Sequence, residues 1–437
     1  MMPDGWVEVR LGDLAAFEHG WPFKSGSYCE PTDNLPIVVG IGNFRYEGGF
    51  RFDETRLNAY AGDFPRQYVL APNDVLMVMT CQTAGGEILG IPGRIPDDGR
   101  TYLHNQRMAK VVVRRRNIVE PDFLYWVFRS ADFNRELVVS ATGTKILHTA
   151  PSRIGAYQFA LPPPDEQRAI ARLLGALDDK IELNRRMNET LEAIARALFK
   201  SWFVAFDPVR AKAEGRQPWG MDAETAALFP SEFEESELGE IPKGWRVGSI
   251  GQIANISRDS TDPSNLPPNT LYIGLEHMPR GSIALDDWET AEKVTSGKLV
   301  FRQGDVLFGK LRPYFKKVGV APLNGVCSSD ILVIGPKKHR FGQVLLQLAD
   351  QEFIDYTEAV SGGTRMPRVS WADVARYSVA VPPEPVGAAF DAHVEPLTER
   401  MRVGIFESRT LAGLRDTLLP KLLSGELRVR EAVCETT

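Results

Sequence analysis

The chain of 437 residues repeats itself, and this repeat constrains the fold more than any other feature of the sequence. Three landmarks recur in the same order: Gly5-Trp6 as Gly244-Trp245, 141–145 (ATGTK) as 361–365 (SGGTR), and 161–163 (LPP) as 381–383 (VPP). The spacing between equivalent landmarks shrinks along the chain, so the second copy has shorter loops. Each copy therefore predicts a globular region, then a proline-marked start and one long helix.

The two long segments carry apolar residues at alternating spacings of four and three, which is the pattern of a coiled-coil seam. The predicted coiled-coil residues are Ile170, Leu174, Leu177, Ile181, Leu191, Leu198 and Trp202 in the first helix and Leu397, Met401, Leu411 and Leu418 in the second. A helix over 165–203 would be roughly 58 Å long at about 1.5 Å per residue.

Both seams have a polar or small centre, formed by Asn184 and Asn188 in the first helix and by Gly404 and Ser408 in the second. If the helices pair antiparallel, these weak layers meet in the middle of the pair. An asparagine in such a seam fixes the register at a cost in stability. We favour this pairing because both copies share the register, and the alternative is that each helix packs only on its own globular domain.

Short apolar runs broken by glycine and proline fill the globular regions and predict strands. These runs lie at 37–39, 75–79, 111–113, 271–273 and 331–334, whereas 123–128 and 343–353 predict helices. The expected fold class is α+β, with two globular domains in tandem pseudo-repeat, separated by two long helices that form an antiparallel coiled coil. The expected parts are a first domain (1–160), a first spacer helix (161–205), an acidic linker (206–243), a second domain (244–380), and a second spacer helix with a tail (381–437).

The net charge of −6 is unevenly distributed along the chain. Segment 207–242 holds nine acidic residues against three basic ones and accounts for the whole excess. It is expected either to tether the two halves or to shield a basic surface, and we favour the tether. Segment 293–317 holds seven basic residues against one acidic residue, with Tyr314 and Phe315 among them. Such a window suits a polyanion, and an ordinary solvated face is the alternative.

Motifs for catalysis and for cofactor binding are missing or incomplete. The four cysteines are scattered and the six histidines form no paired cluster, so no metal site and no disulfide framework are expected. Gly304–Leu311 approaches a phosphate-binding loop, but Leu311 stands where a serine or threonine must reach the metal. The tetrapeptide that holds a flipped base in DNA adenine methylases is absent. Neither a long apolar run nor a secretory signal is present, so a cytoplasmic protein is expected.

Four segments resemble the specificity (S) subunit of Type I restriction–modification enzymes. They are 161–203 (LPPPDEQRAIARLLGALDDKIELNRRMNETLEAIARALFKSWF), 233–245 (FEESELGEIPKGW), 309–317 (GKLRPYFKK) and 411–427 (LAGLRDTLLPKLLSGEL). Together with the repeat, the resemblance covers essentially the whole chain.

The resemblance implies two target recognition domains, each reading one half of a bipartite, asymmetric DNA sequence, with the coiled coil setting the gap. It also implies a non-enzymatic subunit whose helices dock methyltransferase (modification) subunits, two of them expected, to which restriction (translocase–nuclease) subunits add. S-adenosylmethionine, ATP and magnesium are then expected only in the partner subunits. The alternatives are a stand-alone DNA methylase or nuclease, and a coiled-coil assembly scaffold that never touches DNA.

Lysine and arginine are the residues expected on DNA phosphates, and arginine, lysine, glutamine and asparagine are those expected on base edges. The candidates in the second domain are Lys310, Arg312, Tyr314, Lys316, Lys317, Arg365 and Arg368. Those in the first domain are Lys24, Arg45, Gln82, Thr83, Lys145 and His148. By the repeat, 82–83 takes the place of the basic loop, and 145–148 takes the place of the second domain's 365–368. For each residue alone, the alternative is a surface side chain without a DNA contact.

Overall fold

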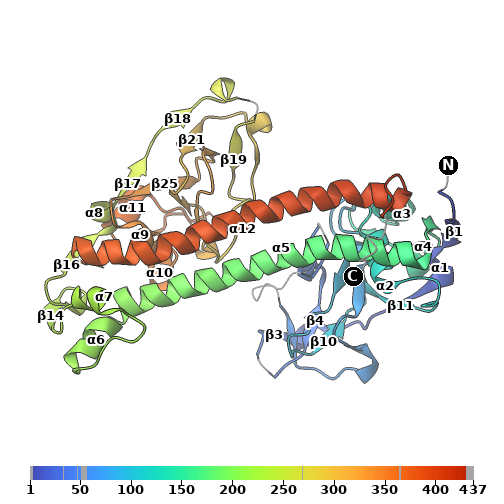
Figure 1. The fold of residues 1–437 in the computed structure, drawn as a ribbon, viewed down its shortest axis with the longest axis horizontal. Helices are drawn as coiled ribbons and strands as arrows, with labels where there is room; N and C mark the ends of the chain where they lie inside the picture. Colours follow the sequence, from blue (N-terminus) through green and yellow to red (C-terminus); the bar gives the residue numbers. More distant parts are fainter. Residues whose placement is uncertain are drawn as a thin grey trace, which may run out of the picture. The chain divides into compact units, whose positions relative to one another are not determined.

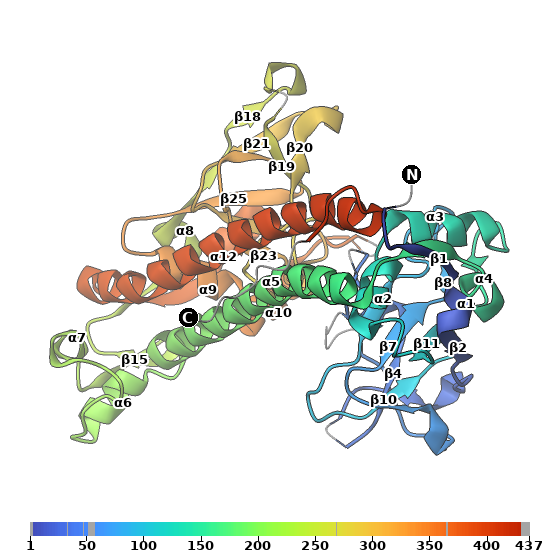
Figure 2. The same cartoon turned by 45° about the vertical axis from the view of Figure 1, so that its right-hand side comes forward.

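The structure is a computed structural model that describes residues 3–32, 34–46, 48–50, 57–267, 269–363 and 366–429 (Figures 1 and 2). The chain forms two compact units. Unit 1 comprises Met1–Asp179 and Leu411–Thr437, and unit 2 comprises Lys180–Thr410. Two long helices, α5 (Pro164–Phe199) and α12 (Glu384–Ser424), contribute to both units. Among the described helices, none has the length and apolar character needed to cross a lipid bilayer.

Unit 1 is built from short strands and short helices. Its strands are β1 (Val7–Arg10), β2 (Ala15–His19), β3 (Tyr28–Cys29), β4 (Ile37–Val39), β5 (Ala59–Tyr60), β6 (Val69–Leu70), β7 (Val75–Val78), β8 (Thr80–Cys81), β9 (Pro92–Arg94), β10 (Tyr102–His104), β11 (Met108–Val113), β12 (Leu147–His148) and β13 (Gln158–Leu161). Its short helices are α1 (Leu11–Leu14), α2 (Pro121–Phe128), α3 (Ala131–Ser140) and α4 (Pro151–Ile154), with single 3-10 turns η1 (Ser25–Ser27), η2 (Ile41–Asn43) and η4 (Arg66–Tyr68).

Unit 2 has the same kinds of elements. Its strands are β14 (Phe233–Ser236), β15 (Gly239–Pro242), β16 (Arg246–Ser249), β17 (Ala254–Ser257), β18 (Ser260–Thr261), β19 (Leu271–Ile273), β20 (Glu289–Thr290), β21 (Lys298–Phe301), β22 (Val306–Gly309), β23 (Val318–Val320), β24 (Gly325–Cys327), β25 (Ile331–Pro336) and β26 (Ser378–Val381). Its shorter helices are α6 (Asp207–Ala213), α7 (Ala223–Ala227), α8 (Ile250–Ile253), α9 (Phe341–Leu348), α10 (Gln351–Val360) and α11 (Trp371–Arg376), with turns η5 (Lys200–Val204), η6 (Pro263–Asn265), η7 (Ala291–Lys293) and η8 (Pro313–Phe315).

The sheets of the two units correspond strand by strand. The four-stranded sheet β2-β11-β7-β9 of unit 1 matches β17-β25-β22-β23 of unit 2. In the five-stranded sheets, β5-β4-β10-β6 matches β20-β19-β24-β21, and both keep one parallel pair, β4 with β10 and β19 with β24. The antiparallel pairs β1–β13 and β16–β26 lead into the two long helices. The predicted α+β class and the tandem pseudo-repeat are confirmed.

The local predictions were right for all five strand runs that were named and wrong for one of the two helices. All five predicted runs lie within or largely within β4, β7, β11, β19 and β25. The single helix predicted over 343–353 is wrong, because α9 ends at Leu348 and α10 begins at Gln351. Asp350 lies between them and accepts a hydrogen bond from the backbone N–H of Glu352 at 2.9 Å, as a helix N-cap does.

The acidic segment 206–243 is folded, so the favoured interpretation of a plain tether is wrong. It forms α6, α7 and the antiparallel hairpin β14–β15. Its apolar residues Phe206, Val209, Phe229 and Ile241 are buried in the same core as Trp245. All nine acidic residues of 207–242 are exposed, and carboxylates of this segment pair locally, Glu232 with Lys243 for example. The segment therefore turns its charge to solvent and buries part of its apolar groups, although Trp219 is exposed.

In unit 2 the long helices pair antiparallel around the predicted polar layer, and both figures show them side by side. Nδ2 of Asn184 in α5 donates to Oγ of Ser408 at 3.3 Å and to Oε2 of Glu407 at 2.9 Å in α12. A Cβ on Gly404 would lie 3.1 Å from Oδ1 of Asn188, so glycine lets the helices approach here. Trp202 lies in η5, directly after the end of α5. The centroid of its ring lies 5.3 Å from that of Phe390, near the start of α12.

In unit 1 the beginning of α5 packs against the end of α12. Ile170 and Leu174 lie in one core with Leu419 and Leu422. Arg415 occupies a seam position of α12 and is buried, and its Nη1 lies 2.6 Å from Oδ1 of Asp178. The direction is again antiparallel, which confirms the predicted coiled coil.

The predicted seam residues are all buried or half-buried in the structure. Ile170, Leu174, Trp202 and Met401 are buried, and Leu177, Ile181, Leu191, Leu198, Leu397, Leu411 and Leu418 are half-buried. The two long helices also pack on the globular domains, as the alternative expected. Ile170 belongs to the core that contains α2, and Trp202 belongs to the core that contains α9.

Candidate nucleic-acid interface

In unit 1 two segments that carry predicted DNA-binding residues lie side by side. Strand β12 pairs antiparallel with β8, and Nδ1 of His148 lies 3.1 Å from Oγ1 of Thr80. Gln82 and Thr83 directly follow β8, Lys145 shortly precedes β12, and all three are exposed. The pairing thus joins an amide, a hydroxyl, an imidazole and an ammonium group on one surface, called here the β8–β12 site.

Neighbouring residues hold the loops of the β8–β12 site in place. The Thr83 hydroxyl donates to the carboxylate of Glu87, and this hydrogen bond lowers the pKa of that carboxyl group. Nδ2 of Asn134 in α3 donates to the carbonyl oxygen of Leu89 at 2.8 Å. Nη1 of Arg153 lies 3.3 Å from Oγ1 of Thr142. Thr142 precedes Lys145 by three residues in the sequence. Arg153 therefore adds a guanidinium group to this surface that the sequence analysis did not single out.

In unit 2 the equivalent segments also lie side by side. Leu311 bridges Arg368, and the Arg312 N–H donates to the Pro367 carbonyl at 2.8 Å. The Val369 N–H donates back to the Lys310 carbonyl at 3.1 Å. This surface, called here the 310–317/368 site, occupies the same topological place after β22 that the β8–β12 site occupies after β7 and β8. The repeat therefore places predicted DNA-binding residues together in both copies.

The loop of the 310–317/368 site has a constrained backbone. Arg312 and Lys316 both adopt left-handed conformations, with φ values of 52° and 50°. The turn η8 lies between them, and Pro313 begins it. Such conformations are uncommon for residues with a Cβ and cluster at functional sites. Tyr314 is exposed, and its ring lies 4.7 Å from that of Phe315.

Lys317 differs from its neighbours because its side chain is turned inward. Its ammonium group donates to the carbonyl oxygen of Leu275, and burial lowers the pKa of this lysine. No hydrogen bond of this kind engages the ammonium group of Lys316 among the described residues. Arg368 is exposed, and its Nη2 lies 3.1 Å from Oδ1 of Asp330, so its guanidinium group is already engaged in an ion pair.

Two predicted residues, Lys24 and Arg45, are not joined to the β8–β12 site. Lys24 is exposed and immediately precedes η1, and Arg45 lies two residues after η2. In the described part of the chain, no hydrogen bond or ion pair connects either side chain to the β8–β12 site. Arg365 lies outside the described residues.

The structure adds Arg280 to the 310–317/368 site. Its guanidinium carbon lies 3.8 Å from the centroid of the Phe315 ring, and the N–H of Gly281 donates to the Lys316 carbonyl at 3.1 Å. Arg280 lies outside the basic window of the sequence, and only tertiary packing brings it to the loop. No linear pattern would have found it.

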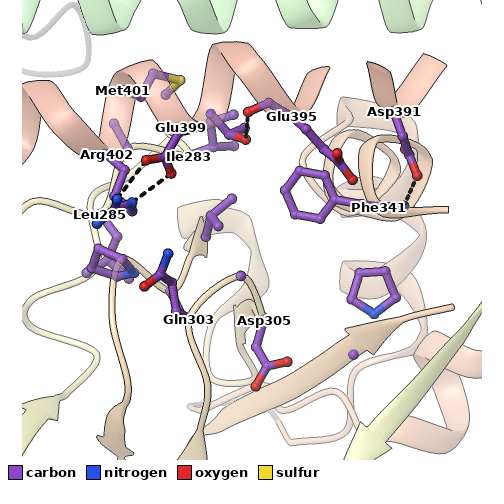
Figure 3. A pocket seen from close by; sticks show the side chains of 18 of the residues that line it. Ile283, Leu285, Gln303, Asp305, Phe341, Asp391, Glu395, Glu399, Met401 and Arg402 are labelled. Carbon is purple, nitrogen blue, oxygen red and sulfur yellow. Dashed lines mark hydrogen bonds and ion pairs between the residues drawn. The ribbon is translucent and has the colours of Figure 1, made fainter. Parts of the chain in front are cut away.

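A cavity of about 630 Å³ lies in unit 2 between the first part of α12 and the ends of strands β22, β23 and β25 (Figure 3). Its lining combines apolar groups such as Leu285 and Met401 with carboxylates at Asp305, Asp391 and Glu395. Burial raises the pKa values of the Asp305 and Asp391 carboxyl groups. Asp391 accepts the backbone N–H groups at the start of α9, at 2.7 and 3.1 Å. None of the predicted DNA-binding residues that the structure describes lines this cavity.

One group of possible metal ligands occurs among the described residues. Ligand atoms of Glu276, His277 and Glu289 all lie within 4.8 Å of one another, and both glutamates are exposed. Nδ1 of His277 accepts the N–H of Gly274 at 2.9 Å. This bond occupies one ring nitrogen and leaves the proton of the neutral imidazole on the other. The arrangement is therefore poorly suited to a metal ion.

Comparisons with known proteins agree on one family. Residues 3–193 match the family described as "Type I restriction modification DNA specificity domain". The chain is 28% identical over 338 residues to the MjaIX specificity subunit of Methanocaldococcus jannaschii, a match that covers 72% of each chain. It is 26% identical over 332 residues to the EcoDI specificity subunit of Escherichia coli, covering 72% of this chain and 73% of that relative. In structure it is similar to the S subunit of a Type I restriction–modification system from M. genitalium, with a TM-score of 0.56, 13% identity and coverage of 97% and 96% of the two chains.

Proposed function

This chain is a relative of the Type I restriction enzyme specificity subunits, and we propose that it is the sequence-specific DNA-recognition subunit of a Type I restriction–modification complex. One observation carries the proposal. The repeat builds the same kind of two-segment surface twice, at equivalent topological positions, but with different side chains. A shared frame with divergent loops suits a reader of two different half-sites.

The chemistry of the two surfaces supports an asymmetric target. The β8–β12 site offers Gln82, Lys145 and His148, whereas the 310–317/368 site offers arginine, lysine and tyrosine. Amide and guanidinium groups can each make paired hydrogen bonds to base edges, and lysines neutralise phosphates. Under the proposal, each unit reads one half of a bipartite sequence.

The long helices are proposed to set the gap between the half-sites and to dock two methyltransferase subunits, to which restriction (translocase–nuclease) subunits add. Large apolar side chains on their outer faces support docking, because they are exposed although the seam is covered. They are Leu173, Leu183 and Ile194 on α5 and Val403 and Leu414 on α12. The proposed division of the chain remains 1–160, 161–205, 206–243, 244–380 and 381–437, with the third part folded.

The proposal assigns no catalysis to this chain. S-adenosylmethionine, ATP and magnesium would be held by the partner subunits, and the whole complex would act in the cytoplasm, where its DNA lies. The purified chain should therefore show no turnover with S-adenosylmethionine or with magnesium. Turnover would instead favour the alternative of a stand-alone methylase or nuclease.

A genome-wide methylation map tests the proposal. Cells that express the partner methyltransferase subunit are compared with and without this chain. A split motif with a fixed gap that vanishes on deletion is the expected result. A chain that carries both Gln82→Ala and Lys145→Ala should alter one half of the motif and leave the other half and the gap unchanged. A map without any motif that depends on the chain, in cells where the purified complex is demonstrably assembled, contradicts the proposal and favours the scaffold.

A further inference from the structure

Two guanidinium groups share one aromatic ring in unit 2. The guanidinium carbon of Arg280 lies 3.8 Å from the centroid of the Phe315 ring, and that of Arg312 lies 6.0 Å from the same centroid. Both distances fall within the range of cation–π attraction, which is about 6 Å. The ring therefore holds two like charges near each other on the loop of the 310–317/368 site.

Neither guanidinium group is neutralised by the protein. In the part of the chain that the structure describes, no ion pair and no side-chain hydrogen bond is made by Arg280 or Arg312, and Nε of Arg312 is buried without a partner. The nearby Asp330 carboxylate is engaged by Arg368 at 3.1 Å. The free protein thus keeps two adjacent cations together, an arrangement that a bound anion would stabilise.

The backbone fixes these two arginines before any ligand arrives. Arg312 sits in a left-handed conformation, and its N–H is tied to the Pro367 carbonyl at 2.8 Å. The segment that carries Arg280 is joined to the loop by the Gly281 N–H, which donates to the Lys316 carbonyl at 3.1 Å. Little ordering remains to be done on binding, which lowers its entropic cost.

We infer that Arg280 and Arg312 together form a site for one backbone phosphate of the DNA. A guanine edge offers two acceptors, which a single arginine fills. A phosphate carries a full charge and more acceptor positions, so it suits two neighbouring guanidinium groups better. This inference rests on the proposed function and gives the loop a positioning role in DNA binding, with Arg280 as a contact residue.

The test measures duplex binding by the complex of this chain with its methyltransferase partner at several salt concentrations. The duplexes are a matched one, taken from the methylation map, and a mismatched one. The variants are Arg280→Gln, Arg280→Lys and Arg312→Gln. The matched control is Arg258→Gln, because Arg258 is an exposed arginine between strands β17 and β18 and lies outside the basic segment 293–317. Thermal unfolding of each variant checks that the fold is retained.

Loss of a phosphate contact should weaken binding to both duplexes by about tenfold and lower the slope of log affinity against log salt by about one. Arg280→Gln and Arg312→Gln should each do so, Arg280→Lys should keep the wild-type slope, and the control should match the wild type. An unchanged slope for Arg280→Gln, or a loss confined to the matched duplex, overturns the inference while the proposed function stands. Equal affinity of the wild-type complex for both duplexes would overturn the proposed function itself.

Discussion

The side-chain amide of Asn184 in α5 donates a hydrogen bond to Oγ of Ser408 in α12 at 3.3 Å. The same amide reaches Oε2 of Glu407 at 2.9 Å, while Oδ1 of Asn184 is buried without a partner among the described residues. The centre of the helix pair in unit 2 therefore contains a polar group that is only partly satisfied. A buried and unpaired oxygen of this kind costs about 1–3 kcal/mol.

Replacement of Asn184 by leucine should stabilise the protein. The change removes the unpaired oxygen and adds apolar surface to the seam, so the free energy of unfolding should rise by about 1 kcal/mol. Denaturant unfolding of the full chain gives the value. Leu183→Gln, on the exposed side of the same helix, is the control and should change stability by less than about 0.5 kcal/mol. A destabilised Asn184→Leu variant would mean that the amide contributes more than it costs.

Trp6 and Trp245 occupy equivalent places in the repeat but should respond differently to replacement by phenylalanine. Nε1 of Trp6 donates to the buried carboxylate of Glu166 at 3.0 Å, whereas Nε1 of Trp245 is buried without a partner among the described residues. Trp6→Phe loses a hydrogen bond to a charged group, and Trp245→Phe loses none. Trp6→Phe should therefore cost about 1.5–3 kcal/mol more. Equal losses in matched denaturant unfolding experiments would show that the bond to Glu166 contributes nothing.

His104 should make the stability of the protein depend on pH. Burial lowers the pKa of its imidazole to about 4, from 6.5 for the exposed group. Between these values the unfolded chain binds a proton that the folded protein does not. The stability is thus full above pH 6.5 and falls as the pH drops toward 4, by up to about 3 kcal/mol.

The variant His104→Gln isolates this contribution. Glutamine can still donate to the Met108 carbonyl, which His104 Nε2 meets at 3.0 Å, but it does not titrate. Unfolding curves at several pH values should show a shallower fall for the variant than for the wild type. Parallel curves would place the pH dependence on other groups.

Lys316 and Lys317 are adjacent but should behave differently. Lys317→Met leaves the Leu275 carbonyl without its donor and should cost about 1 kcal/mol of stability without changing the salt dependence of DNA binding. Lys316→Met should leave the stability within about 0.5 kcal/mol and lower the salt slope by about one. Thermal unfolding and duplex binding by the assembled complex measure the two effects. A stability loss for Lys316→Met together with a lower salt slope for Lys317→Met would contradict our interpretation of the loop.

The sequence predicted the regular parts of this fold well. A seam repeated over ten positions, from Ile170 to Trp202, gives a periodic signal that no loop imitates, and the weak layer at Asn184 and Gly404 followed from it. The strands were found because β-branched runs are short and end at glycine or proline. These features depend on neighbours along the chain.

The features that were missed depend on tertiary context. In 206–243, the high density of acidic residues suggested an unfolded tether. The core residues Phe206, Val209 and Phe229 are irregularly spaced and give no periodic signal. The break between α9 and α10 depends on one capping residue, Asp350, inside an otherwise helical run. Arg280 reaches Phe315 from a separate loop, and the inward turn of Lys317 depends on the Leu275 carbonyl.

Within each of the two proposed recognition surfaces, main-chain bonds join the two segments, through the β8–β12 ladder in unit 1 and the Leu311–Arg368 bridge in unit 2. Such bonds use N–H and C=O groups that every residue except proline supplies. The side chains at exposed positions such as Gln82 and Lys145 can therefore change without loss of the joint that presents them. The main-chain atoms of these residues thus maintain the fold, whereas their side-chain atoms would determine the DNA target. A chain built in this way can acquire a new DNA target by a few surface substitutions while its core stays as it is.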